Sequence, residues 1–328
     1  MSALLQVEGL VKTFSVPAGL VGRRSVSAVA GVSLHVDRAE VLGLVGESGS
    51  GKTTLGRCVL GMTPVDGGSI TFDGAEVTAL RGRRRAEFRR RVQPVFQDPY
   101  ASLDPRWRVG RSIREALDAH RTGTRANRHQ RVLDLLDRVG LSPSYAERLP
   151  RQLSGGQRQR VGVAAALASG PDLIVADEPV SALDVSVQAQ VLNLFADLQR
   201  DLGVAVLFIA HDLAVVEHLS QRVAVMYLGR IAEVASTRDI FAGPSHPYTR
   251  ALVAAIPHPD PEHRIDVVPL SGEIPSPLDP PPGCRFHPRC PLVTDTCRTV
   301  RPDLEPVSST HLAACLVTAP PTPAHAPH

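Results

Sequence analysis

The sequence predicts an α/β fold with a mixed β-sheet core, a helical insertion and a small cysteine-containing C-terminal domain. Three observations support this prediction. Short apolar runs alternate with amphipathic helical patterns through roughly the first 240 residues, which is typical of a sheet covered by helices. Strand signals vanish between Pro99 and Leu153. Four of the five cysteines lie in the last 45 residues.

The expected strands are nearly continuous apolar runs, as buried strands of a covered sheet should be. They are residues 5–7, 32–36, 41–45, 69–72, 92–96, 173–176, 204–210 and 222–227. Helices are expected at 132–139, where apolar residues recur at i, i+3, i+4 and i+7, and at 154–168 and 186–202. Gly140 and Gly203 supply C-terminal stops for two of them.

Residues 46–53 read GESGSGKT and directly follow the expected strand 41–45. They match the phosphate-binding pattern G-x-x-x-x-G-K-[ST] in its strand-then-helix context. The glycines allow successive N–H groups to turn toward a phosphate, and the following helix adds its positive end. We expect Lys52 to reach the β- and γ-phosphates and the Thr53 hydroxyl to ligate Mg²⁺. A chance match in a glycine-rich turn is the alternative. The predicted nucleotide-binding residues here are Gly46, Glu47, Ser48, Gly49, Ser50, Gly51, Lys52, Thr53 and Thr54.

Two later apolar strands end in polar residues that suit nucleotide hydrolysis. The run 173–176 is followed by Asp177 and Glu178, and the run 204–210 by His211. Ligands of open α/β sheets sit at the carboxyl ends of the strands. We therefore expect Asp177 to bind Mg²⁺, Glu178 to activate the attacking water, and His211 to contact the γ-phosphate. A solvated strand end and a structural histidine are the alternatives.

Composition excludes other function classes. The net charge of +3 gives no global attraction to nucleic acid. No run approaches the roughly 20 apolar residues of a membrane span. Glu8 and Lys12 stand too early for a signal peptide, so we expect the chain to stay in the cytoplasm. Residues 81–91 contain seven arginines, but Gly82, Glu87 and Phe88 interrupt the run and no series of stacking aromatic residues is interleaved with it, which favours an exposed basic face over a nucleic-acid site.

The segment 153–157 reads LSGGQ and resembles the signature of the ATP-binding cassette (ABC) ATPases. The order GESGSGKT, FQDP, LSGGQRQR, LIVADEP, SALD and AHD is similar to that superfamily from residue 4 to about 240. Ser154 should cap a helix whose bare N–H groups form a second anion site. The resemblance implies that this site faces the γ-phosphate of ATP held by an opposite subunit, so that two subunits sandwich two ATP molecules. The signature residues are Ser154, Gly155, Gly156 and Gln157.

The same resemblance assigns three further roles. It implies that Gln97 contacts Mg²⁺ and senses a membrane partner, with an exposed loop amide as the alternative. Asp184 corresponds to the marker of the loop that crosses to the other subunit. Phe14 corresponds to the aromatic residue that stacks on adenine, although a core phenylalanine of the first sheet fits its position equally well.

Three segments resemble one group of these ATPases more closely, and they are FQDPYASLDP from Phe96, HPYTRAL from His246 and SGEIPSPLDPPPGCRFHPRCP from Ser271. They are similar to the ATPase subunits of bacterial dipeptide and oligopeptide importers, a group that also serves nickel and opine uptake. The first segment is like the second of the two paired ATPases, the DppF/OppF type. A nickel or opine importer, a soluble ABC ATPase acting on DNA or ribosomes, and a metal-regulated binding module stay open as alternatives.

The resemblance also implies partners and domains. The partners are a second ATPase, identical or distinct, two membrane permeases, and indirectly an extracytoplasmic substrate-binding protein, with no nucleic acid. The location is peripheral, at the cytoplasmic face of the membrane. The expected domains are a nucleotide-binding domain over 1–240, its helical subdomain over about 98–165, a C-terminal domain over 241–318, and a disordered tail over 319–328.

The four C-terminal cysteines suggest a metal centre, because disulfides are rare in the cytosol. Their spacings of five, six and seventeen intervening residues lack the CxxC pattern of structural zinc. The resemblance implies a 4Fe–4S cluster, with zinc or empty thiols as alternatives. The proposed ligands are Cys284, Cys290, Cys297 and Cys315.

Overall fold

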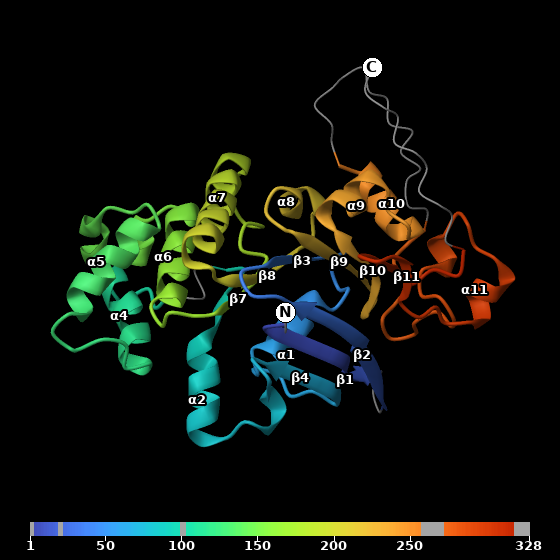
Figure 1. Cartoon of the computed structure of the whole chain (residues 1–328), viewed down its shortest axis with the longest axis horizontal. Coiled ribbons are helices and arrows are strands. Elements are labelled where there is room, and N and C mark those ends of the chain that lie inside the picture. The colour runs from blue at the N-terminus through green and yellow to red at the C-terminus, as the bar shows by residue number, and fades with distance from the viewer. Residues whose placement is uncertain (1–2, 19–21, 99–102, 257–271, 318–328) are drawn as a thin grey trace, which may run out of the picture.

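The computed structural model describes residues 3–18, 22–98, 103–256 and 272–317 (Figure 1). Within them, two sheets lie one above the other. The larger sheet has eight described strands in the order β11-β12-β10-β9-β3-β8-β7-β6. Their bounds are β3 Val41–Val45, β6 Val92–Val95, β7 Leu173–Asp177, β8 Ala205–Ala210, β9 Arg222–Tyr227, β10 Arg230–Ser236, β11 Glu305–Ser308 and β12 His311–Ala313.

The five strands from β9 to β6 run parallel, whereas β10, β12 and β11 continue the sheet antiparallel. The parallel strands β3, β7 and β8 are almost wholly buried, as their apolar runs predict. Val45 is opposite Ala210, and Asp177 is opposite Ile209. The carboxyl ends of β3, β7 and β8 therefore meet at one edge of the sheet, where the polar residues that follow them come together.

The smaller sheet is antiparallel, in the order β2-β1-β4-β5. Its strands are β1 Leu5–Ala18, β2 Gly22–Val36, β4 Gly67–Phe72 and β5 Ala75–Glu76, and helix α1 spans Lys52–Val59. Apolar side chains of α1, of this sheet and of the near face of the larger sheet form one buried cluster. This packing holds the first turn of α1 against the end of β3.

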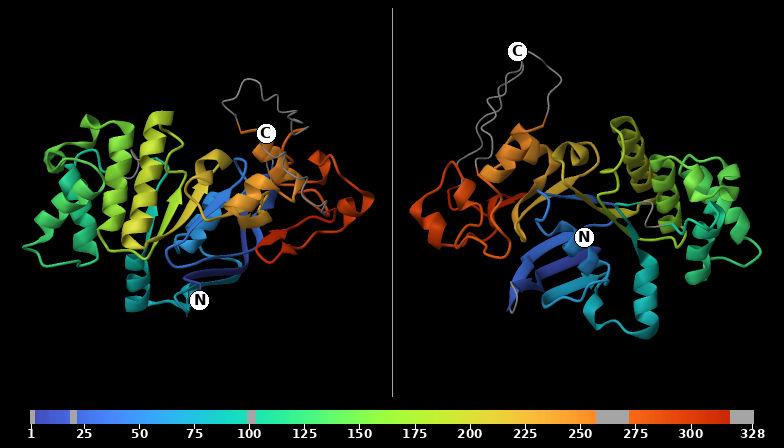
Figure 2. Two further views of the ribbon diagram at one scale, coloured as in Figure 1. Left: turned by 45° about the horizontal axis from the view of Figure 1, so that its top comes forward. Right: turned by 180° about the vertical axis from the view of Figure 1, so that it is seen from behind.

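The predicted helical insertion is present at one end of the molecule (Figures 1 and 2). The described residues between 103 and 153 contain no strand, and their helices α4 and α5 pack on α6, which in turn packs on α7. The bounds are α4 Val109–Ala119, α5 Arg128–Arg138, η2 Pro143–Glu147, η3 Pro150–Gln152, α6 Gly155–Leu167 and α7 Val185–Leu202. Residues 99–102, part of the FQDPYASLDP segment, lie outside the described residues.

The arginine-rich run forms helix α2, Gly82–Arg91, which follows the 3-10 turn η1, Val77–Ala79, and extends away from the larger sheet (Figure 1). Phe88 is its buried residue, and most of its arginines are exposed. At its end, Arg91 pairs with Asp73 and Asp172, which anchors the helix to both sheets. The helix is therefore a solvent-exposed basic face.

The C-terminal segment adds strands to the larger sheet. Strand β12 pairs with β10 through Glu233 opposite Ala313, and β11 pairs with β12. Helix α8, Leu213–Glu217, lies between β8 and β9. The helical elements that follow β10 are α9 Thr237–Ala242, α10 Pro247–Ala254, η4 His287–Arg289 and α11 Asp295–Thr299. The division of the chain near residue 240 stays a prediction, and residues 257–271 and the tail 319–328 lie outside the described residues.

A buried carboxylate anchors this segment to β10. Glu233 is fully buried and accepts hydrogen bonds from the backbone N–H groups of Ser245 and His246 and from the His311 ring. Burial alone would raise the pKa of Glu233, but these hydrogen bonds hold it below its ordinary value. Because a buried carboxylate without partners is costly, the three donors fix α10 and β12 against β10.

Candidate nucleotide site

The phosphate loop joins β3 to α1. Gly49 and Gly51 have φ of 79° and 105°, in the left-handed region that favours glycine. A Cβ on Gly46 would lie 2.1 Å from the backbone oxygen of Met226, and one on Gly51 would lie 2.1 Å from that of Ala28. Glycine is therefore required at 46 and 51 by close backbone approach, and at 49 by backbone angle.

The Lys52 ammonium is held inside this loop. Its Nζ donates to the backbone oxygens of Gly46 (2.6 Å) and Glu47 (3.0 Å) and to Ser50 Oγ (3.4 Å). Burial lowers the pKa of Lys52, although the nearby carboxylates of Glu178, Asp177 and Glu47 oppose that shift. A cation is thus fixed at the mouth of a glycine-rich turn, where an anionic phosphate would bind.

The side chain of Thr53, in the first turn of α1, contacts that of Asp177, the last residue of β7. Thr53 Oγ1 donates to Asp177 Oδ1 at 2.8 Å. Burial raises the pKa of Asp177, and the hydrogen bond from Thr53 opposes it. Two adjacent ligands of Mg²⁺, each about 2.1 Å from the metal at right angles, lie roughly 3 Å apart. The two oxygens therefore fit neighbouring positions of a magnesium shell.

Glu178 lies at the centre of a second polar group. Its Oε2 accepts from Gln97 Nε2 at 3.1 Å and lies 3.3 Å from His211 Nδ1. Ser181 Oγ lies 3.3 Å from Gln97 Nε2 and donates to the Glu178 backbone oxygen at 3.1 Å. The loops after β6, β7 and β8 thus bring these side chains together. Sequence reasoning placed Ser181 only in the SALD segment and did not assign it a contact with Gln97.

The backbone of Glu178 has φ of 46°, which is uncommon for a residue with a side chain. Its N–H donates to the Ile209 oxygen of the neighbouring strand β8 at 3.0 Å. Such strained angles persist where the surroundings fix them, and they gather at functional sites. With this backbone conformation the Glu178 side chain contacts Gln97 and His211.

The LSGGQ segment begins helix α6. Ser154 Oγ accepts the Gln157 N–H at 3.3 Å, and the Gln157 side chain accepts the Ser154 N–H at 3.0 Å, which together form a capping box. A Cβ on Gly156 would lie 2.2 Å from Val187 Cγ1 of α7. The two glycines let α6 pack closely on the region of α7 while the N-terminal end of α6 stays accessible.

Comparisons with known proteins agree with this geometry. A family model described as "ABC transporter" matches residues 29–181, and one described as "Oligopeptide/dipeptide transporter, C-terminal region" matches residues 232–297. A relative from Sinorhizobium fredii, named "Probable peptide ABC transporter ATP-binding protein", is 51% identical over 325 residues, which are 98% of this chain and 92% of the relative. The chain belongs to the ATP-binding proteins of ABC transporters.

Other relatives of this ABC ATPase agree. The dipeptide transport ATP-binding protein DppF of Haemophilus influenzae is 45% identical over 313 residues, covering 95% of this chain and 96% of that protein. A solved structure, the dimeric post-hydrolysis state of the ATP-binding cassette MJ0796 bound to ADP and Pi, superposes with a TM-score of 0.63 at 26% identity. It covers 71% of this chain and 99% of the solved one. No helix in the described part of the chain is long and apolar enough for a membrane span.

Phe14, for which the sequence left two positions open, and Asp184 both lie at the surface of the ABC ATPase. Phe14 is 41% exposed on β1, so it is not a core residue of the first sheet. Lys12 Nζ lies 5.4 Å from its ring centroid. Asp184 caps α7, accepting from Ser186 Oγ and the Val187 N–H, and these hydrogen bonds lower its pKa. The Phe14 ring is available for stacking on a base.

Sequence reasoning missed two contacts of the phosphate loop. The Arg289 guanidinium binds both carboxylate oxygens of Glu47, at 2.8 and 3.1 Å, and the Tyr248 hydroxyl accepts the Glu47 N–H at 2.9 Å. These partners are 242 and 201 residues from Glu47 in the sequence, so no local pattern could have indicated them.

The four C-terminal thiols of the ABC ATPase are electrostatic neighbours. Burial raises the pKa of Cys284 to about 11, and it also raises the pKa of Cys290 and Cys315, with smaller effects from the other thiols. The backbone N–H of Val317 donates to Cys315 Sγ at 3.4 Å. No group of three or more His, Cys, Asp or Glu side chains in the described residues is close enough to hold a metal ion. The thiols share one region, but their spacing here gives no support to the predicted cluster.

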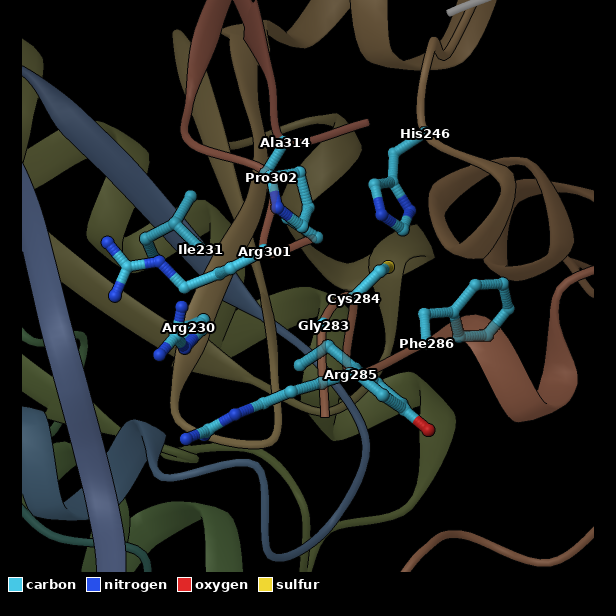
Figure 3. Close-up of a pocket in the computed structure, with 12 residues that line it drawn as sticks. Arg230, Ile231, His246, Gly283, Cys284, Arg285, Phe286, Arg301, Pro302 and Ala314 are labelled. Carbon is cyan, nitrogen blue, oxygen red and sulfur yellow. The ribbon is translucent and has the colours of Figure 1, made fainter. Parts of the chain in front are cut away.

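Cys284 also borders a small arginine-lined pocket between β10 and the C-terminal segment (Figure 3). Burial lowers the pKa of Arg230, and it lowers the pKa of Arg285 to about 10, with the neighbouring guanidinium groups adding to the effect. Arg285 donates to the backbone oxygen of Leu228, in the turn between β9 and β10. The region around the thiols is therefore cationic on this side.

Proposed function

We propose that this ABC ATPase binds and hydrolyses ATP at the edge of the larger sheet to drive a peptide importer. The observation that carries the proposal is the position of the Glu178 carboxylate between Gln97 and His211, next to the Thr53–Asp177 pair. A carboxylate in this place can accept the proton of a water that attacks the γ-phosphate.

In this mechanism the residues of the site mainly position the triphosphate and the attacking water and neutralise negative charge. Lys52 and the loop N–H groups bind the β- and γ-phosphates, while Thr53 and Asp177 would hold Mg²⁺, which neutralises charge on the triphosphate. Glu178 takes the proton of the water. His211 and Gln97 orient Glu178 through their contacts with its Oε2. Phe14 stacks on the adenine base.

The signature residues Ser154 to Gln157 complete the site of a second ATPase. Helix α6 stands with α4 and α5 at one end of the molecule, whereas α1 lies beneath the middle of the larger sheet (Figure 1). The exposed N-terminal end of α6 is therefore proposed to act on a triphosphate bound by an opposing subunit, with Asp184 at the crossing loop. The dimeric state of the related cassette MJ0796 supports this arrangement.

The proposed cargo is a dipeptide or oligopeptide. The C-terminal match to the oligopeptide/dipeptide transporter region and the names of the relatives support peptides over nickel or opines. The proposed partners are two membrane permeases and a second ATPase, identical or distinct, with an external binding protein acting indirectly. The chain would then lie at the cytoplasmic face of the membrane as a peripheral subunit.

Reconstitution tests the cargo. The ATPase is purified with its permeases, placed in vesicles with the binding protein, and assayed for ATP hydrolysis with dipeptides, longer peptides, nickel complexes and opines. We expect peptides to stimulate hydrolysis several-fold and the other compounds to leave it at its basal rate. Stimulation by nickel complexes or opines alone would contradict the peptide assignment.

For the C-terminal thiols, we propose a 4Fe–4S cluster on Cys284, Cys290, Cys297 and Cys315. The gathering of four cysteines in the C-terminal part of the sequence and the Val317 N–H that donates to Cys315 Sγ support it, because hydrogen bonds to sulfur tune such clusters. Anaerobic purification of the full chain should give a brown protein with about four irons per chain, and a Cys290→Ser variant should lose them. A colourless protein without iron, with or without zinc, would contradict the cluster.

A further inference from the structure

Glu47 is held in the phosphate loop through its N–H, its backbone oxygen and its carboxylate. Its N–H donates to the Tyr248 hydroxyl, its backbone oxygen accepts from Lys52, and its carboxylate accepts two hydrogen bonds from Arg289. The first variable position of the loop is therefore fixed through both its main chain and its side chain.

Both outer partners belong to the C-terminal part of the chain. Tyr248 lies on α10 and is fully buried, and the Arg289 side chain, at the end of η4, is only 6% exposed. Phe286 packs against the rings of Tyr227 and Tyr248, with both centroid distances at 5.4 Å. Arg289 also reaches the Tyr227 hydroxyl at 3.4 Å. The packing of these aromatic rings thus fixes the positions at which Tyr248 and Arg289 contact Glu47.

The charge of Glu47 gives these contacts a consequence for ATP. A carboxylate in a phosphate-binding loop repels a triphosphate unless a cation neutralises it. Arg289 supplies that cation in a bidentate, nearly buried pair, the strong form of such a contact. The Tyr248 hydroxyl accepts the Glu47 N–H, so this N–H is directed to Tyr248 and not to a phosphate. The orientation of the N–H groups that follow in the loop is thereby fixed at its first variable position.

We propose that Arg289 and Tyr248 are positioning residues for ATP binding, through which the segment beyond β10 sets the affinity of the phosphate loop. The inference rests on the proposed ATP site. It adds that the segment beyond β10 acts directly on this site. Neither residue touches the nucleotide, and both act through Glu47.

A double-mutant cycle tests the pair. Binding of a fluorescent ATP analogue with Mg²⁺ is measured for the full chain and for Arg289→Gln, Glu47→Gln and the double variant. Arg289→Gln leaves the Glu47 charge unpaired beside the triphosphate, so affinity should fall by about tenfold or more. The affinity of Glu47→Gln should fall less. The affinity of the double variant should be close to that of Glu47→Gln, because the carboxylate that repels the triphosphate is gone.

Two further variants separate positioning from folding. Arg298→Gln removes an exposed arginine of the same segment and should bind like the unmodified chain. Tyr248→Phe removes only the hydroxyl and should weaken binding several-fold while the melting temperature changes little. With a purely structural role for Arg289, the double variant would not recover binding and would bind as weakly as Arg289→Gln.

The outcomes distinguish this inference from the proposed function. If the unmodified chain binds no ATP analogue, the nucleotide site itself is wrong. If the unmodified chain binds it and Arg289→Gln binds equally well, or if the two substitutions are additive, the positioning role of Arg289 is overturned while the ATP site stands.

Discussion

Replacing Glu178 with Gln should leave ATP binding intact and lower ATP hydrolysis by at least about 100-fold, the usual contribution of a general base. Glutamine has the same shape and can still contact Gln97 and His211, but it cannot accept the proton of the attacking water. Because ATP stays bound while hydrolysis stops, two subunits should remain closed around it.

Three measurements check this expectation: phosphate release, retention of an ATP analogue, and dimer content by size-exclusion chromatography with Mg-ATP. Glu217→Gln, the same substitution at an exposed position of α8, is the matched control and should behave like the unmodified chain. Normal hydrolysis by Glu178→Gln would remove Glu178 from the mechanism.

Replacing Gly155 with Asp should abolish hydrolysis in the assembled complex while each isolated chain still binds ATP. The carboxylate would stand at the N-terminal end of α6, where it repels the γ-phosphate of the opposing site. Folding should tolerate it, because a Cβ at Gly155 would meet only the end of the Leu183 side chain, at 3.1 Å. We expect a loss of about 100-fold or more in hydrolysis.

Gly155→Ala provides the control for size, since it adds the same Cβ without charge. Hydrolysis by the complex and ATP binding by the isolated subunit are compared for both variants. If Gly155→Asp hydrolyses ATP at the normal rate in the complex, the signature does not act on a neighbouring ATP, and the dimeric mechanism is wrong.

The parts of the fold that sequence predicted are those with strong local patterns. The buried strands β3, β7 and β8 are uninterrupted apolar runs, and the ends of α5 and α7 are marked by glycine. Strands β10, β11 and β12 were not predicted. β11 is exposed along its whole length and begins with Glu and Pro, so it has no alternation that could indicate a strand.

The candidate site shows the same division. The approach of Thr53 to Asp177 follows from strand ends that meet at one edge, which a sequence can indicate. The unusual backbone of Glu178 and the pair between Glu47 and Arg289 depend on tertiary contacts between distant segments. Sequence alone likewise left two positions open for Phe14, and the exposure of its ring excludes the core position.

The Glu47–Arg289 pair also has a consequence for the stage of synthesis at which the nucleotide site is complete. A ribosome adds about 5 to 20 residues per second, and the two partners are 242 residues apart. Glu47 is therefore synthesised tens of seconds before Arg289, the residue that neutralises its charge. Until Arg289 has been synthesised, the nascent protein carries an unpaired carboxylate in its phosphate loop, so the proposed role of Arg289 implies that full affinity for ATP is acquired only after residue 289 has emerged.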